Sequence, residues 1–225
     1  MTVLEHLEEL RNRLLKVGIA LAVTTSFSFL YSAQLVDILT APVGGRTALA
    51  SIEITENISI FMRVTLLAGV VLGLPFILHQ TVAYLAPGLT PRERRWLYML
   101  IPAMTFFFLA GAAFAWWVMV PVAIPFLINF LGIPTHPRPL NYISFVTSLL
   151  FWVGISFEMP LVVFFLAKLK WVTAGQLVRG WRYAFMGIAL IAAVVTPTVD
   201  PINMGLVILP LVVLYLISII LARIA

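Results

Sequence analysis

The sequence contains no cysteine and very few charged residues. Without cysteine, neither disulfide bonds nor thiolate metal sites can form, and the redox compartment cannot be inferred from cysteine usage. Charged residues make up only 10% of the chain and hydrophobic residues 62%, and the mean hydropathy of +1.09 lies well outside the range of soluble domains. The chain is therefore predicted to be an integral membrane protein.

Motifs of well-known catalytic chemistry are absent as well. The sequence has no glycine-rich phosphate loop, no H-E-x-x-H and no G-x-S-x-G, and His6, His79 and His136 fall in three different regions. We therefore expect no enzyme, no cofactor and no metal site. The net charge of +5 comes from basic residues scattered between apolar runs rather than gathered on one soluble face, so nucleic acid is not an expected partner.

Apolar runs of helical length account for most of the chain. A bilayer core about 30 Å thick needs roughly 20 helical residues to cross it, so 225 residues allow about six spans and no sizeable soluble domain. The predicted fold class is an all-α, six-helix transmembrane bundle in a single integral membrane domain, residues 1–225. An amphipathic cytoplasmic helix at 3–13 precedes spans at about 14–31, 58–85, 96–121, 142–167, 183–195 and 204–221.

The basic residues predict the orientation of these spans. Eleven of the 14 Lys and Arg residues fall on one side, and only Arg46, Arg63 and Arg138 fall on the other. Basic residues near span ends are retained in the cytoplasm, which places both termini there.

The last two helices and the two longer outer segments are unusual. The run 183–195 would be only about 20 Å long, so the final pair is predicted to be two short helices, either re-entrant or crossing a thinned bilayer. The proline-containing outer segments 32–57 and 122–141 are predicted to be structured caps, with a short helix at about 123–131.

Two glutamates lie in basic segments on the side predicted to be cytoplasmic. The simplest interpretation of Glu9 is an i,i+4 surface pair with Arg13. Glu93 follows Thr90 and Pro91 in a capping box that would start the third span. The functional alternative is that the two carboxylates bind a pair of guanidinium groups through bidentate hydrogen bonds, for which lysine lacks the planar fork.

Polar residues inside the apolar runs are few. Glu158 lies ten residues before Lys168, or about 15 Å along a helix, which places it near the middle of the bilayer. Such a carboxylate either faces a polar functional site or is a neutral acid hydrogen-bonded within the bundle, for example to backbone released by Pro160. His79 and Gln80 close the second span and are interpreted as interfacial hydrogen bonders rather than ligands.

Four segments of the sequence resemble the motifs of a known family. They are HLEELRNRL (residues 6–14), APGLTPRERR (86–95), GISFEMPLV (154–162) and VTPTVDP (195–201). In this order they are similar to motifs of TatC, the six-span core subunit of the twin-arginine protein translocase, and the likeness covers nearly the whole chain. The resemblance implies two short final helices and cytoplasmic termini, in agreement with the predicted topology.

The resemblance also implies roles for single residues. The acids that receive the twin-arginine motif of a folded substrate's signal peptide match Glu9 and Glu93, and the same motifs contain Leu10, Arg11, Arg94 and Arg95. Further matching positions are the intramembrane Glu158, the structural residues Pro42 and Tyr84, and Thr196, Pro197 and Asp200, where the TatA and TatB partners dock. Many members carry Ser-Gln shortly after the turn aspartate, where this chain has Asn203 and Met204, so the polar contact to the partner helix would be either weaker here or supplied by Asn203.

The predicted function is that of a receptor and scaffold for export of folded proteins. Twin-arginine signal peptides would bind at Glu9 and Glu93, their apolar segment would lie near Glu158, and TatA and TatB would open a passage driven by the proton motive force. The expected location is the bacterial cytoplasmic (inner) membrane, within lipid and in an oligomeric complex. Two alternatives remain: a small proton-coupled secondary transporter that uses Glu158 as a relay, and a structural membrane protein whose polar residues only hold the bundle together.

Overall fold

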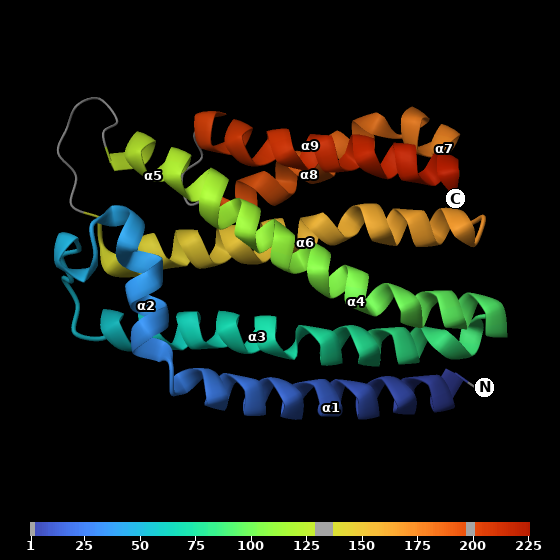
Figure 1. Ribbon diagram of the computed structural model, residues 1–225, viewed down its shortest axis with the longest axis horizontal. Helices are drawn as coiled ribbons and strands as arrows, with labels where there is room; N and C mark the ends of the chain where they lie inside the picture. The colour runs from blue at the N-terminus through green and yellow to red at the C-terminus, as the bar shows by residue number, and fades with distance from the viewer. Residues whose placement is uncertain (1–2, 129–136, 197–200) are drawn as a thin grey trace.

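The protein is built from helices throughout the part of the chain that the structure describes. The computed structural model describes residues 3–128, 137–196 and 201–225, and these ranges contain no strand (Figure 1). The α-helices are α1 (Val3–Phe29), α2 (Ser32–Thr40), α3 (Glu56–Leu85), α4 (Pro91–Phe114), α5 (Val120–Ile128), α6 (Pro139–Lys168), α7 (Ala174–Arg179), α8 (Trp181–Val195) and α9 (Pro201–Ile224). The 3-10 turns are η1 (Ala41–Val43), η2 (Arg46–Ala48) and η3 (Ala86–Gly88), and η4 (Ala115–Met119) is a π-helical turn.

The helix predicted at 3–13 is not separate from the first apolar run. Both belong to α1, which continues without a break because no proline interrupts residues 3–29 and most of its residues are good helix formers. α1 ends at Phe29, and the chain then bends by 76° into α2. The first outer segment therefore turns across one end of the bundle (Figure 1).

The short helix predicted at about 123–131 is also part of a longer element. α4 passes through η4 into α5, so Pro91–Ile128 form one apolar helical stretch of 38 residues. In η4 the N–H of Val120 donates to the carbonyl of Ala115, five residues earlier, and this wider turn keeps the helix continuous ahead of Pro121 and Pro125. Residues 129–131 lie outside the described ranges.

Only one of the two final helices is short. α8 has 15 residues, whereas α9 has 24. α9 begins at Pro201, where the missing N–H of proline leaves no helix bond unmade, and ends at Ile224 with Arg223 in its last turn. The prediction of two short final helices is therefore wrong for the second.

The chain is a multi-pass membrane protein by the length and apolarity of its helices. Four stretches are long and apolar enough to cross a membrane: Glu56–Gly88, Pro91–Ile128, Pro139–Lys168 and Met204–Ile224. The bent pair of α1 and α2 would provide a fifth, and α8 is a shorter apolar helix. The limits of the six spans remain predictions.

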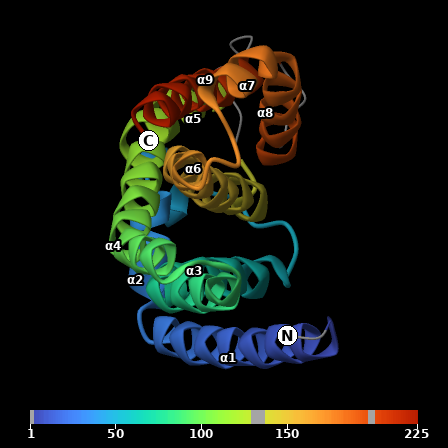
Figure 2. The ribbon, with the colours of Figure 1, turned by 90° about the vertical axis from the view of Figure 1, so that its right-hand side faces the viewer.

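The long helices run side by side, and both termini lie at the same end of the molecule (Figure 1). Figure 2 looks at this end and shows α1, α3, α4 and α9 along a curved wall, with α6 inside the curve. α6 packs against α3, α4 and α9, while α1 packs mainly against α3. The buried side chains of α6, such as Ile143, Val146 and Val153, recur every three or four residues and form the centre of the main apolar core.

Candidate functional site

The segments that carry Glu9 and Glu93 meet at the end of the molecule that holds both termini. Figure 1 shows the start of α1, the η3 connection between α3 and α4, the end of α6 and α7 at this end. We call it the terminal end. The opposite end, formed by α2, η1, η2 and the start of α6, is called the cap end.

Glu9 forms its expected pair with Arg13, but the pair is not simply on the surface. The Arg13 Nε and Nη2 atoms both donate to Oε1 of Glu9, at 3.0 and 2.6 Å, and Nη1 donates to Oε1 of Gln80 on α3 at 3.2 Å. The side chains of Arg13 and Glu9 are only 23% and 19% exposed. The Glu9 Oε2 atom is covered by protein and has no hydrogen-bond partner among the described residues, which costs roughly 1 to 3 kcal/mol or more for a charged group.

Glu93 starts α4 through the capping box that the sequence predicts. Its Oε2 atom accepts hydrogen bonds from the backbone N of Thr90 at 2.8 Å and from the Thr90 hydroxyl at 2.7 Å. In return, the N–H of Glu93 donates to the Thr90 hydroxyl at 3.5 Å. Within the described residues no bond is made to Oε1 of Glu93, so one oxygen of this carboxylate remains available.

The basic and apolar neighbours of the two acids also lie at the terminal end. Leu10 is half-buried, whereas Arg11, Arg94 and Arg95 are exposed. The Arg94 guanidinium lies 5.8 Å from the centre of the Tyr98 ring, and Arg11 pairs loosely with Glu8 at 3.6 Å. These three exposed arginines therefore lie at the same end of the molecule as the two carboxylates.

An apolar groove opens beside these residues. It has a volume of about 560 Å³ and is lined by side chains of α3, α4 and α6, including Val82, Leu100 and Phe165. His6 and Tyr84 form part of its wall, and their rings stack with centroids 4.5 Å apart. Tyr84 thus joins the start of α1 to the end of α3 at the edge of the groove.

Glu158 lies elsewhere and does not line this groove. It is half-buried on α6, and no described residue forms a hydrogen bond or ion pair with it. The structure therefore gives no support to the interpretation of Glu158 as an acid hydrogen-bonded within the bundle. Its neighbour Phe157 packs tightly on α4, where a Cβ added to Gly111 would lie 2.7 Å from the Phe157 ring.

The other predicted residues are spread over the molecule. Pro42 is exposed in η1 at the cap end, far along the bundle from Glu9. Thr196 is buried, and its hydroxyl donates to the carbonyl of Ala192 at 2.8 Å. Pro197 and Asp200 lie outside the described residues, and for Asn203 only the backbone, in the first turn of α9, is described.

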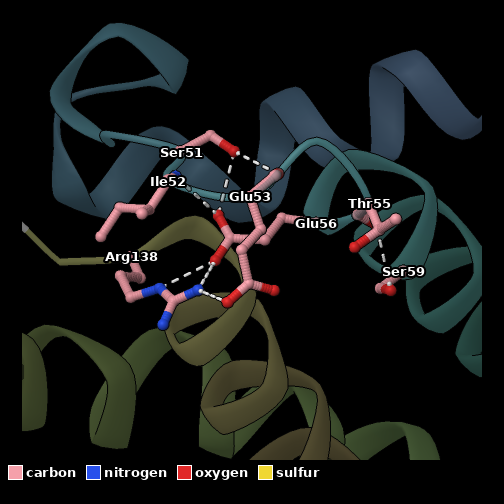
Figure 3. Close-up of polar contacts among 7 residues, drawn as sticks. All are labelled: Ser51, Ile52, Glu53, Thr55, Glu56, Ser59 and Arg138. Atoms are coloured by element: carbon pink, nitrogen blue, oxygen red, sulfur yellow. Dashed lines mark hydrogen bonds and ion pairs between the residues drawn. The ribbon is translucent and has the colours of Figure 1, made fainter.

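A polar cluster at the cap end was missed by the sequence analysis. Glu56, the first residue of α3, is completely buried and accepts hydrogen bonds from Nε of Arg138 at 2.8 Å, from Ser51 at 2.9 Å and from the N–H of Ile52 at 3.2 Å (Figure 3). Arg138 also bonds Glu53 at 2.9 Å, and these carboxylates raise its pKa above the ordinary value, so the guanidinium stays charged. We call Glu53, Glu56 and Arg138 the cap-end clamp. The only feature of the sequence that pointed to this cluster is Glu56, an acid at the start of an apolar run.

Residues 3–128, 137–196 and 201–225 contain no cluster of three or more His, Asp or Glu side chains suited to a metal.

Comparison with known proteins shows which family this chain resembles. A family model described as "Sec-independent protein translocase protein (TatC)" matches residues 5–210. A protein of that name from Deinococcus radiodurans is 38% identical over 229 residues, which cover 98% of this chain and 85% of the relative. Another from Carboxydothermus hydrogenoformans is 34% identical and covers 99% and 93% of the two chains, respectively.

A solved structure agrees with these relatives. The crystal structure described as "Twin Arginine Translocase Receptor- TatC" superposes with a TM-score of 0.86 at 31% identity, over 97% of this chain and 98% of the other. The sequence match extends over nearly the whole chain, and the three-dimensional match includes the helices that carry both glutamates. The chain therefore belongs to the TatC family of Sec-independent protein translocase proteins.

Proposed function

We propose that this TatC-family chain is the signal-peptide receptor and scaffold of its translocase. The terminal end would bind the arginine pair of a signal peptide on a folded precursor through Glu9 and Glu93. TatA-type and TatB-type single-span subunits would then assemble on the chain and open a passage driven by the proton motive force. The chain itself carries out no catalysis in this proposal.

The observation that carries the proposal is the hydrogen bonding of the two carboxylates. Both lie at the terminal end, and each has one oxygen without a hydrogen bond from a described residue, Oε2 in Glu9 and Oε1 in Glu93. The other oxygen of each acid is held by Arg13 or Thr90, which fixes the carboxylate in place. Glu93 therefore offers a guanidinium one free oxygen, whereas the unpartnered oxygen of Glu9 is covered and becomes accessible only when the side chains around it move, so neither acid offers the two oxygens assumed for a bidentate pair.

The groove supports a binding place for the apolar part of the signal peptide. It lies at the same end as the two acids and is almost entirely apolar. Its volume of about 560 Å³ accommodates a few large side chains. The apolar segment is therefore proposed to enter between α3, α4 and α6, with Glu158 reached only by residues further along it.

The partner subunits are proposed to dock on α8. This short helix has large exposed apolar side chains, namely Tyr183, Phe185, Met186, Leu190 and Val194. Thr196 directly follows α8, so the proposed contact at Thr196 would lie at the end of this helix. Pro197, Asp200 and Asn203 are proposed as further contacts, of which Pro197 and Asp200 lie outside the described residues. A single-span helix seated there would cover apolar area that the chain alone leaves unpaired.

The test of receptor function is binding of a twin-arginine signal peptide to Glu9→Gln and Glu93→Gln variants. Glutamine keeps the size of the side chain, and at position 93 it also keeps the capping box, so only the charge is lost. We expect each variant to weaken binding by about tenfold or more, since hydrogen bonds to charged groups contribute about 1.5 to 3 kcal/mol. The measurement is site-specific photo-cross-linking or fluorescence anisotropy with the purified full chain.

Glu8→Gln is the matched control. Glu8 lies next to Glu9, but its side chain is 67% exposed and pairs only with Arg11. This variant should bind within about twofold of wild type, as expected for an exposed pair. Wild-type binding by the Glu9 and Glu93 variants would refute the receptor assignment.

The orientation has its own test, because the chain lacks cysteine and any introduced thiol is unique. The terminal end is proposed to face the cytoplasm of a bacterial cell and the cap end the outside. A membrane-impermeant maleimide added to intact spheroplasts should label Thr47→Cys in the cap end but not Ala225→Cys, and lysis should make Ala225→Cys reactive. Labelling of Ala225→Cys before lysis would reverse the orientation.

A further inference from the structure

Arg13 already binds the carboxylate of Glu9 in the protein without a ligand. Its Nε and Nη2 atoms both donate to Glu9 Oε1, and its Nη1 atom donates to Gln80 Oε1 at 3.2 Å. The guanidinium is therefore held between two helices, by an acid on α1 and by a neutral amide on α3. A ligand guanidinium at Glu9 would meet another guanidinium already in place.

This arrangement neutralises the charge on which the receptor depends. Arg13 lies 2.6 Å from the carboxylate, and the terminal end also carries Arg11, Arg94 and Arg95 in exposed positions. While Arg13 is bound to Glu9, an approaching cationic peptide therefore gains little from that carboxylate. The second oxygen of Glu9 is covered and unpartnered, so the free state does not satisfy the carboxylate fully either.

We propose that Arg13 is an internal competitor of the signal-peptide arginine, and that the peptide binds Glu9 by displacing it. Arg13 then remains on Gln80, which it already contacts, and the incoming guanidinium takes over the carboxylate, including the unpartnered oxygen. This inference rests on the proposed receptor function. It goes beyond that function by proposing how binding at Glu9 is regulated, with Arg13 and Gln80 as positioning residues.

The exchange bears on affinity rather than on specificity. Displacement replaces one planar guanidinium by another, so the number of ion pairs at Glu9 is unchanged. The cost of displacing Arg13 is the same for any ligand, so it lowers the affinity for arginine-pair and lysine-pair peptides by the same factor. A preference for arginine over lysine comes instead from the planar fork, which lysine lacks.

The two positioning residues are predicted to act in opposite directions. Arg13→Gln removes the competitor and should lower the dissociation constant about fivefold for an arginine-pair signal peptide, and by the same factor for the peptide carrying a lysine pair. Gln80→Met keeps the volume but removes the second partner of the displaced Arg13, and it should weaken binding about fivefold. A merely structural role of both residues would weaken binding in both variants.

The experiment measures the dissociation constants of labelled arginine-pair and lysine-pair signal peptides with the full chain in lipid nanodiscs. Arg92→Gln, which removes one charge at the same end without contact to Glu9, should stay within about twofold of wild type. If Arg13→Gln does not fold, Arg13→Lys serves in its place and should bind the arginine-pair peptide more tightly than wild type does.

Failure of this inference differs from failure of the receptor function. If Glu9→Gln loses binding but neither Arg13 variant binds more tightly than wild type, Arg13 is no competitor and only the present inference is overturned. If Glu9→Gln and Glu93→Gln bind as wild type does, the receptor function itself is wrong. Tighter binding of both peptides by Arg13→Gln, with an unchanged preference for arginine over lysine, supports the exchange.

Discussion

Gly69→Ala is expected to push α1 away from α3 and to destabilise the protein by about 2 kcal/mol. A Cβ at this position would lie 2.3 Å from the Thr25 hydroxyl, 2.8 Å from its Cα and 2.9 Å from its backbone N. Two of these atoms belong to the backbone, so a side-chain rotation cannot relieve the overlap and the whole helix has to move. The loss is measured as a lower melting temperature in detergent, and it should be accompanied by weaker signal-peptide binding, because Glu9 on α1 and Gln80 on α3 would separate.

Gly73→Ala, one turn further along α3, is the matched control. A Cβ there meets the Thr24 hydroxyl at 3.3 Å and otherwise only side-chain carbons at 3.8 Å. The gain in helix propensity, up to about 1 kcal/mol, should offset this mild contact and leave stability nearly unchanged. Equal melting temperatures for the two alanine variants would show that α1 and α3 do not depend on close backbone approach.

Arg138→Met is expected to lower the melting temperature by roughly 5 °C or more. Methionine fills much of the volume of the arginine but leaves the Glu56 carboxylate, which is completely buried, with only Ser51 and the N–H of Ile52 as partners. Breaking a buried pair from one side leaves an uncompensated charge, which is costlier than removing both partners. Thermal unfolding in detergent measures the effect.

The double variant Glu56→Gln with Arg138→Met distinguishes the effect of the buried charge on stability from the effect of the lost contacts. It should recover part of the lost stability, because the glutamine side chain is neutral. Glu53→Gln provides the control, since the Glu53 side chain is 62% exposed and its bond to Arg138 should contribute little. A double variant less stable than Arg138→Met would exclude a buried unpaired carboxylate as the cause.

Local patterns in the sequence predicted local structure well. The Thr90 and Glu93 capping box is present, and the Glu9 and Arg13 pair forms as its i,i+4 spacing indicates. Both depend only on residues within one helical turn, so neighbouring positions in the sequence are sufficient to foresee them. The family resemblance was also confirmed, because a TatC family model matches residues 5–210 and a solved TatC structure superposes with a TM-score of 0.86.

Contacts between distant segments could not be predicted from the sequence. Gln80 was expected to form a hydrogen bond near the span end, but its partner Arg13 lies 67 residues away. The cap-end clamp joins Glu56 to Arg138 over 82 residues. Such pairs depend on how the helices are placed side by side, and no periodicity in one segment contains that information. The continuity of α4 with α5 was missed for a different reason, since prolines at 121 and 125 suggest a break that the π turn avoids.

The cap-end clamp has a consequence for the order in which the chain is made. Glu56 leaves the ribosome 82 residues before Arg138, and at about 5 to 20 residues per second this delay is roughly 4 to 16 s. During that time its partner Arg138 has not yet been made, so the segment around the carboxylate has to stay hydrated while α3, α4 and α5 are already being inserted. The cap end can therefore form only late in synthesis, when the start of α6 places Arg138 next to Glu56 and the buried ion pair is made.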